Sequence, residues 1–257
     1  MLAETRFLQI LDVVDRKKTA TVAELCLEIG ASEATIRRDL ITLAKQNRLN
    51  KVHGGATSLD AVFETEERSI MEKSHMHLEE KQRIADYAAT LINDDDFVFM
   101  DSGTTTQQLA ESIRKTNATF VTNGVMHGRI LTQKGIRTFV VGGLLKKRTE
   151  ALIGVTAVAM LENYNFTKSF IGMNGISLKE GYTTPDVEEM AIKSTVMKQS
   201  YVTYVLADHS KFGKVTAANV AKLAKGYIIT DKVDDVAYME HTLIKVVGGA
   251  EKEVKGK

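Results

Sequence analysis

The stretch FVFMDSGTTTQQLAE, residues 97–111, changes character twice over a short distance. Its apolar run, Phe97 to Met100, has the length and composition of a buried strand. An acid and a series of small hydroxyl-bearing residues follow, and a helical pattern begins immediately after them. A strand that runs through a short polar loop into a helix is typical of α/β proteins, and the free amides at such a helix start favour an anion. The stretch therefore predicts an α/β fold and a loop suited to phosphate.

The same succession of apolar run and helical pattern recurs from Glu79 onward. Strands that are apolar throughout, and that alternate with helices, indicate a largely parallel sheet covered on both faces. We therefore expect residues 79–257 to form one α/β domain around an open, largely parallel sheet. The predicted strands are FVFMD (97–101), TFVTN (119–123), TFVVGG (138–143), SFIGMNG (169–175), VTYVLAD (202–208), YIITD (227–231) and IKVVGG (244–249).

Each predicted strand ends in small or polar residues, and the carboxyl ends of the strands line the ligand crevice of an open α/β sheet. These residues predict one anion-binding site, in which Lys211 supplies a compact positive charge. Two alternatives stay open, because the hydroxyls of the first loop can merely cap the helix, and Asp208 can hold a turn. Glu188, Glu189 and Lys193 face either the crevice or solvent. The candidate effector-binding residues are Asp101, Ser102, Gly103, Thr104, Thr105, Thr106, Thr122, Asn123, Gly142, Gly143, Gly172, Asn174, Gly175, Asp208 and Lys211.

Residues 1–57 follow another pattern, in which three helical segments precede a hairpin. Thr21 stands three residues before Glu24, the spacing of a capping box that begins the second helix. Ser32 is a suitable N-cap for a third helix over residues 33–46. Two short extended runs joined by a Gly-Gly pair come next and predict a wing. We expect a winged helix-turn-helix here, followed by a linker over residues 58–78.

The third helix carries basic side chains on the face opposite its apolar stripe. On an isolated helix such a face is usually only solvated, but the second helix of a helix-turn-helix meets base edges and phosphates of DNA. The pattern does not decide whether Arg37 or Arg38 reads bases. The candidate DNA-binding residues are Ser32, Thr35, Arg37, Arg38, Lys45, Lys51 and His53.

Composition limits the remaining possibilities. The chain has 257 residues, of which 44% are hydrophobic and 26% charged, as in ordinary globular proteins. Its net charge of +1 does not by itself indicate nucleic-acid binding. With a single cysteine, Cys26, no signal-peptide pattern and no apolar run of about 18 residues, we expect a cytoplasmic protein without membrane contact. We expect no metal site or cofactor, since His75 and His77 lack partner ligands at useful sequence spacing.

The segment SEATIRRDLITLAKQNRLNKVHGGA, residues 32–56, resembles the winged helix-turn-helix of the DeoR family of bacterial regulators. The later motifs DSGTTT (101–106), VTNG (121–124), VVGG (140–143), FIGMNGI (170–176) and LADHSKFG (206–213) follow the family's pattern in order. The resemblance covers nearly the whole chain. It implies a transcriptional repressor whose C-terminal domain senses a phosphorylated sugar, with a fold akin to ribose-5-phosphate isomerase and CoA-transferase-like proteins.

Two other functions compete with this one. An isomerase-like enzyme with a DNA-binding head would need a general base, and isomerases of this fold carry an acid-rich turn where GMNGI (172–176) has no carboxylate. A DNA-binding protein whose second domain only forms oligomers would not need polar strand ends. The sequence therefore favours a regulator that binds double-stranded operator DNA as a dimer or tetramer. It leaves open which sugar phosphate is the effector.

Overall fold

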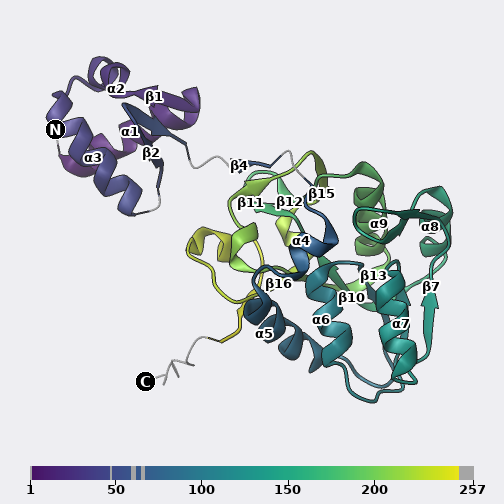
Figure 1. Ribbon diagram of the computed structural model, residues 1–257. Helices are drawn as coiled ribbons and strands as arrows, with labels where there is room; N and C mark the ends of the chain where they lie inside the picture. The colour runs from purple at the N-terminus through teal and green to yellow at the C-terminus, as the bar shows by residue number, and fades with distance from the viewer. Residues whose placement is uncertain (1, 47, 59–61, 65–66, 249–257) are drawn as a thin grey trace, which may run out of the picture. The chain divides into compact units, whose positions relative to one another are not determined.

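The computed structural model describes residues 2–46, 48–58, 62–64 and 67–248. It divides the chain into two compact units between Val62 and Phe63. Each unit has its own hydrophobic core, one in the N-terminal unit and two in the C-terminal unit. The two units are shown in Figure 1, and each is described separately below.

The N-terminal unit is a three-helix domain with a small antiparallel sheet. Thr21 forms the expected capping box with Glu24, and Ser32 accepts a hydrogen bond from the Thr35 amide at the start of the third helix. The predicted hairpin is present, and a third strand that the sequence did not indicate pairs with it, in the order β1-β3-β2. The elements are α1 (Ala3–Lys17), β1 (Thr19–Thr21), α2 (Val22–Ile29), α3 (Glu33–Lys45), β2 (Asn50–Val52) and β3 (Gly55–Thr57).

Helix α3 packs by the apolar stripe that its periodicity predicts, with Ile36, Leu40 and Leu43 buried in the N-terminal core. Asp39 is also buried, and it forms an ion pair with Arg6 of α1 in which both ends of the carboxylate are used. A buried carboxylate needs such a partner, since desolvation without one is costly. The pair therefore fixes α3 against α1 and determines which face of α3 points outward.

The C-terminal unit is built on a seven-stranded sheet with the order β17-β16-β13-β10-β5-β6-β7. Every recorded pairing within it is parallel. All seven strands predicted from apolar runs lie in this sheet, so the expected open, largely parallel architecture is confirmed. The strands are β5 (Phe97–Met100), β6 (Thr119–Thr122), β7 (Thr138–Val140), β10 (Phe166–Gly172), β13 (Ser200–Leu206), β16 (Tyr227–Thr230) and β17 (Ile244–Val246).

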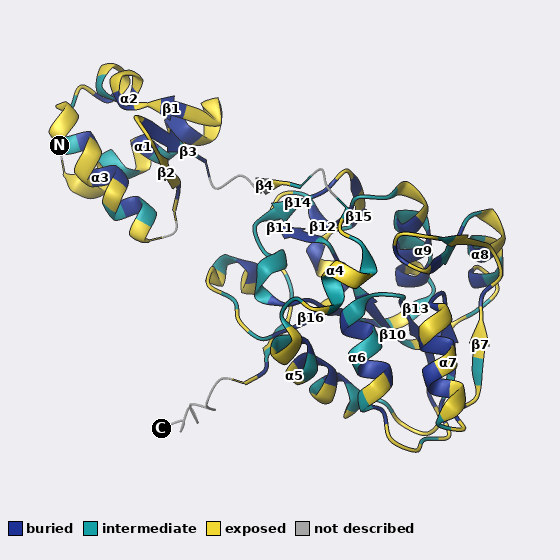
Figure 2. Ribbon diagram, in the orientation of Figure 1, coloured by how far each residue is buried: buried dark blue, intermediate teal, exposed yellow. Residues whose placement is uncertain are grey.

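Both faces of the sheet are covered, which explains why its strands are apolar on both sides. In β5, Val98 and Met100 join one core and Phe99 joins the other. The first core also contains the buried residues of α5, α6 and α7, and the second those of α8 and α9. Figure 2 shows the buried sides of these helices turned toward the sheet. The helices are α5 (Leu78–Ala89), α6 (Thr104–Ser112), α7 (Val125–Gln133), α8 (Val155–Leu161) and α9 (Val187–Lys198).

Short strands outside the main sheet were not predicted. They form a hairpin, β8-β9, a three-stranded antiparallel sheet, β11-β12-β15, and a two-stranded pair, β14-β4. Three short 3₁₀ turns accompany them. The elements are β4 (Val62–Phe63), β8 (Leu144–Lys146), β9 (Ala151–Ile153), β11 (Gly175–Ser177), β12 (Gly181–Thr184), β14 (Lys214–Val215), β15 (Ala218–Ala221), η1 (His209–Lys211), η2 (Leu223–Lys225) and η3 (Val236–Glu240).

The described part of the segment that the sequence assigned to a linker belongs largely to the C-terminal unit. Helix α4 (Ile70–Ser74) begins with a capping box between Ser69 and Glu72. The amide of Ile70 donates to the carbonyl of Arg148, and Glu67 accepts a hydrogen bond of 2.7 Å from Lys146. These contacts hold the segment against the β8-β9 hairpin of the C-terminal unit.

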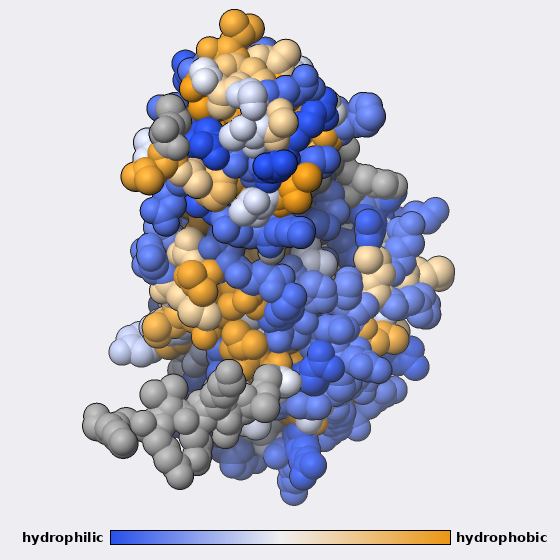
Figure 3. All heavy atoms as spheres, turned by 90° about the vertical axis from the view of Figure 1, so that its left-hand side faces the viewer, coloured by the Kyte–Doolittle hydropathy of each residue, from blue (hydrophilic) through white to orange (hydrophobic). Residues whose placement is uncertain are grey.

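The face turned to the viewer in Figure 3 is mostly hydrophilic, with hydrophobic side chains gathered in a few patches. Among the described residues, no helix combines the length and the apolar character needed to cross a bilayer.

Candidate functional site

The site lies where the order of the strands in the sheet reverses, between β5 and β10. Strand β5 is paired with β10; β6 and β7 follow on one side of this pair, and β13, β16 and β17 follow on the other. Such a switch point, at the carboxyl ends of the strands, is where open α/β sheets bind ligands. A cavity of about 270 Å³ lies there, near the lower end of the roughly 300–1,000 Å³ typical of small-molecule pockets.

Many of the predicted effector-binding residues meet in this cavity. Those that line it are Asp101, Ser102, Gly103, Thr104, Thr105, Gly172, Asn174, Asp208 and Lys211. Side chains that the sequence did not single out complete the wall, from the segment before α5, from α9 and from the turns after β13. They include Glu64, Arg68, Ile70, Lys73, Met76, His77, Lys81, Thr149, Met173, Leu206, Ser210 and Lys214, together with Glu189 and Lys193, whose direction the sequence left open.

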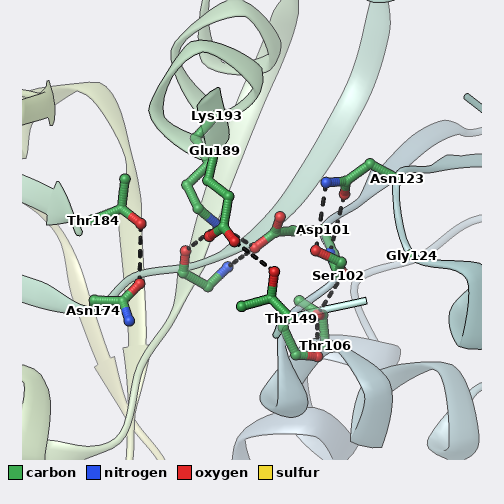
Figure 4. Close-up of polar contacts among 12 residues, drawn as sticks. Asp101, Ser102, Thr106, Asn123, Gly124, Thr149, Asn174, Thr184, Glu189 and Lys193 are labelled. Carbon is green, nitrogen blue, oxygen red and sulfur yellow. Dashed lines mark hydrogen bonds and ion pairs between the residues drawn. The ribbon is translucent and has the colours of Figure 1, made fainter. Parts of the chain in front are cut away.

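Thr106, Thr122 and Asn123 do not line the cavity, although the sequence proposed them for effector binding. All three are buried, and their polar atoms serve the protein's own backbone. Asn123 Oδ1 accepts from the Ser102 amide at 3.1 Å, and the Thr106 hydroxyl donates to the carbonyl of Asp101 at 2.6 Å (Figure 4). Thr122 accepts from the Gly124 amide. Their role is to hold the loop after β5 in shape.

Gly142, Gly143 and Gly175 also lie outside the cavity wall. The first two follow β7, which is the edge strand and two positions away from the switch point. A Cβ on Gly175 would lie 2.5 Å from the Thr183 hydroxyl, so this glycine allows two strands of the small sheet to pack. Polar residues or glycines at the end of a strand therefore predict cavity residues only where that strand lies next to the switch point.

A buried histidine on α7 supports the loop that follows β5. His127 is 1% exposed, and its Nε2 lies 3.1 Å from the Gly103 carbonyl and 3.2 Å from the Thr106 hydroxyl. Burial lowers the pKa of His127 to about 4, so the ring is neutral near pH 7. The neutral ring can donate from Nε2 to the carbonyl, which fixes the loop without adding a charge.

Replacing Gly124 with alanine should disturb this support. A Cβ there would lie 2.4 Å from His127 Nδ1 and 3.1 Å from Ser102 Cα, and the His127 ring is held in place. Overpacking of this kind costs about 1–3 kcal/mol, so the thermal midpoint of the C-terminal unit should fall. Gly142→Ala is the matched control, because its Cβ would meet only ordinary contact with Thr156 at 3.6 Å. Equal midpoints for the two variants would contradict the role given to Gly124.

Asp101 and Lys193 form the buried centre of the cavity wall. They are 2% and 6% exposed as side chains, and Nζ lies 2.5 Å from Oδ2. The same carboxylate oxygen accepts from the Gly172 amide at 3.1 Å, and Lys193 donates to the Gly172 carbonyl at 3.0 Å. The pair thus joins β5, β10 and α9, as Figure 4 shows. Asp101 therefore has a structural role, rather than one as a free acceptor for sugar hydroxyls.

The helix that begins at the cavity presents free amides. Gly103 is the N-cap of α6 and no side chain caps this end. The hydroxyls of Thr104 and Thr105 are thus not used as the cap, which was the simpler interpretation of the motif. The amides of the first turn have no intrahelical partner and carry the positive end of the helix dipole. An anion in the cavity would meet them together with the threonine hydroxyls.

Three basic side chains add positive charge to the cavity: Arg68, Lys73 and Lys81. Within the described part of the chain, none of them has a carboxylate within ion-pair distance. Burial lowers the pKa of Lys73, and it lowers the pKa of Lys81 to about 8. Burial destabilises the charged form of these lysines, so an anion in contact with their ammonium groups stabilises that form strongly.

The carboxylates of the cavity are already engaged. Glu64 pairs with Lys214 at 2.7 Å, and Glu189 accepts from Thr149 at 2.7 Å and Lys146 at 3.2 Å. Asp208 Oδ1 accepts from the Ser210 amide at 2.9 Å, so this residue does hold the turn after β13. Burial raises the pKa of Asp208, but Lys211 and the Ser210 hydrogen bonds outweigh it and keep the pKa below its usual value. The lowered pKa of Asp208 makes its carboxylate a weak general base.

The N-terminal unit presents the predicted basic face. Arg38 and Lys45 are exposed on α3, and Thr35 and Thr42 lie on the same helical stripe. Arg37 is exposed as well, but its Nε donates to Glu33 at 3.0 Å. Ser32 caps the helix, while Lys51 and His53 are exposed on β2 and on the turn that follows it. The helix and the wing thus each carry accessible donors.

Known proteins similar to this chain include several regulators. A Bacillus subtilis protein, the uncharacterized HTH-type transcriptional regulator FruR, is 39% identical over 96% of this chain and 99% of its own length. The lactose phosphotransferase system repressor of Staphylococcus aureus is 34% identical over 93% and 96%. A solved structure of ribose 5-phosphate isomerase A from Methanocaldococcus jannaschii shares 14% identity with a TM-score of 0.39, over 51% of this chain and 53% of that one.

Two family profiles match the two units. The DeoR-like helix-turn-helix domain covers residues 6–62, and the DeoR C terminal sensor domain covers residues 76–232. Together they include the third helix, the wing and the loops around the cavity. The chain belongs to the DeoR family of bacterial transcriptional regulators.

Proposed function

We propose that this protein is a cytoplasmic repressor of sugar-utilisation genes, and that a phosphorylated sugar bound in the C-terminal cavity controls its hold on operator DNA. One observation carries the proposal: the cavity combines the uncapped start of α6 with Arg68, Lys73 and Lys81. Helix-start amides and basic side chains recognise phosphate. Asn174 and the hydroxyls of Thr104 and Thr105 offer hydrogen bonds to the sugar.

The ligand regulates DNA binding only if it has different affinities for two arrangements of the protein. Residues 67–78 are well placed for this, because Arg68 and Lys73 line the cavity and follow the DNA-binding unit in the chain. Contact of these side chains with phosphate would bias the segment that leads to the N-terminal unit. We infer a dimer or tetramer, since two winged helices on two half-sites give a tight operator complex.

The engaged carboxylates favour a sensor over an isomerase. Asp101 is bound to Lys193, and the turn over residues 172–175 has no acid. An aldose–ketose isomerase needs a general base beside the substrate carbon. We therefore expect no conversion of bound sugar phosphates, and the appearance of product from ribose 5-phosphate would contradict this part of the proposal.

Thermal melting tests the proposal with a panel of pentose and hexose phosphates and their unphosphorylated sugars. A ligand that binds only the folded protein raises the midpoint. At a concentration of 100 Kd the gain is about 2.7 kcal/mol, which corresponds to roughly 5–10 °C. At least one sugar phosphate should produce the shift, and its unphosphorylated sugar should not. A flat response to the whole panel would refute the sensor.

The pKa of Lys81 gives the binding a pH dependence. Its ammonium loses its proton near pH 8 in the free protein, whereas a bound phosphate dianion stabilises the charged form. Binding above pH 8 therefore takes up a proton, and affinity should fall by up to about tenfold per pH unit between pH 8 and 9. Lys81→Gln should bind more weakly at pH 7 and show no such fall, as titration calorimetry can measure. The same slope in this variant would assign the dependence to another group.

A further inference from the structure

Three side chains at the edge of the cavity approach one another from distant parts of the chain. His77 immediately precedes α5, while Asp208 and His209 follow β13. One potential ligand atom from each residue lies within 4.8 Å of the other two. His77 and Asp208 line the cavity wall.

One oxygen of Asp208 has no hydrogen-bond partner among the described residues. The residue is fully buried, and its Oδ1 accepts the hydrogen bonds of Ser210. Oδ2 accepts no hydrogen bond from the described residues, and the Nζ of Lys211 stays 3.8 Å away. A buried carboxylate oxygen in this state is costly unless something fills its coordination.

His209 is held in the way typical of a metal ligand. Its Nδ1 lies 2.8 Å from Asp231 Oδ2, and its amide donates to the other oxygen of Asp231. With the proton on Nδ1, the Nε2 atom presents a lone pair; a carboxylate behind a histidine commonly fixes this tautomer in metal sites. The His77 ring lies edge-on to it, with the ring centres 5.1 Å apart.

We propose that His77, Asp208 and His209 bind a divalent transition-metal ion of the zinc class. Imidazole suits such ions better than it suits magnesium or calcium, and three protein ligands leave one position of a tetrahedron open. Ligand atoms around zinc lie about 3.4 Å apart, so a small rotation of the half-buried His77 ring closes the site. Asp208 and Asp231 balance the charge of the ion.

The sequence did not predict this site, because His77 lies far along the chain from Asp208 and His209, and no metal-ligand spacing links them. The fold supplies the third ligand, bringing the start of α5 to the end of β13. An ion there would tie these two elements together at the cavity wall. Binding of the ion does not require the sugar phosphate, so its test uses the metal alone.

The test is thermal melting of the full chain with zinc chloride, against magnesium chloride and a chelator. At 100-fold excess over Kd, zinc should raise the midpoint by about 5 °C or more, and magnesium should not. His77→Gln and His209→Gln should lose most of this shift. His75→Gln is the matched control, since His75 is exposed two residues from His77 and belongs to no cluster among the described residues; it should keep the shift.

Cobalt supplies a readout that needs no variant. Bound by two imidazoles and a carboxylate in a tetrahedral site, Co²⁺ should give visible absorption that excess zinc removes. Absence of this absorption, or a zinc shift in His77→Gln equal to that of the unmodified chain, would overturn the proposal.

Discussion

Replacing Arg38 with alanine is expected to weaken operator binding by about 1–3 kcal/mol, or roughly 5- to 150-fold, for each half-site. Arg38 is exposed on α3, and within the described residues no carboxylate pairs with it. Arg37 is instead bonded to Glu33, four residues earlier. We therefore expect Arg38 to contribute the stronger contact. Fluorescence anisotropy on a DNA fragment from upstream of the protein's own gene measures the effect.

The control for this experiment is Arg83→Ala, which removes one exposed positive charge from α5 in the other unit. It should leave operator affinity nearly unchanged, whereas Arg37→Ala should have an effect smaller than that of Arg38→Ala. The Arg38 variant should retain the thermal shift produced by its sugar phosphate, because the cavity lies in the C-terminal unit. Unaltered operator binding would show that α3 is not the recognition helix.

Replacing Lys193 with methionine should strongly destabilise the C-terminal unit. It leaves Asp101, 2% exposed, as an uncompensated charge between β5 and β10. Removing one partner of a buried ion pair costs about 3–5 kcal/mol, which corresponds to a fall of roughly 6–20 °C in the melting temperature. Differential scanning calorimetry measures it directly.

The matched control is Lys179→Met, because Lys179 pairs with Glu180 at the surface and is 79% exposed. Such a pair contributes little, so its melting temperature should stay close to that of the unmodified chain. Adding Asp101→Asn to Lys193→Met should recover part of the loss, since it removes the unpaired charge. If the two lysine variants melted alike, Asp101 and Lys193 would not be the structural link described above.

The sequence predicted the main sheet well because its central strands are buried on both faces. Such strands are apolar runs, as in 97–100 and 227–230, and they stand out from helical periodicity. Strands β11 and β12 are short, antiparallel and rich in Gly, Ser and Thr, so they resemble loops. Helix α4 has five residues and no buried position, and it lacks the periodicity that identifies longer helices.

The site was predicted in part, for a related reason. The loop after β5 and the ends of β10 and β13 adjoin the switch point, and their polar residues reach the cavity. The order of the strands depends on long-range pairing, so the sequence could not exclude Gly142 on the edge strand. One signal was available for Lys81, which shares the buried face of α5 with Ile84, Ala85 and Ala88. Lysine is rarely buried unless it has a partner, so its position on this face points to a polar environment there.

The central claim is that a sugar phosphate in the C-terminal cavity controls DNA binding, and anisotropy of operator DNA tests it most directly. Unmodified protein and Lys81→Gln should bind the operator equally in the absence of ligand. The sugar phosphate found by melting should release the DNA from the unmodified protein, and Lys81→Gln should need at least about tenfold more, because it lacks one charge-assisted contact. Release of both proteins at the same concentration, or of neither, would contradict the account.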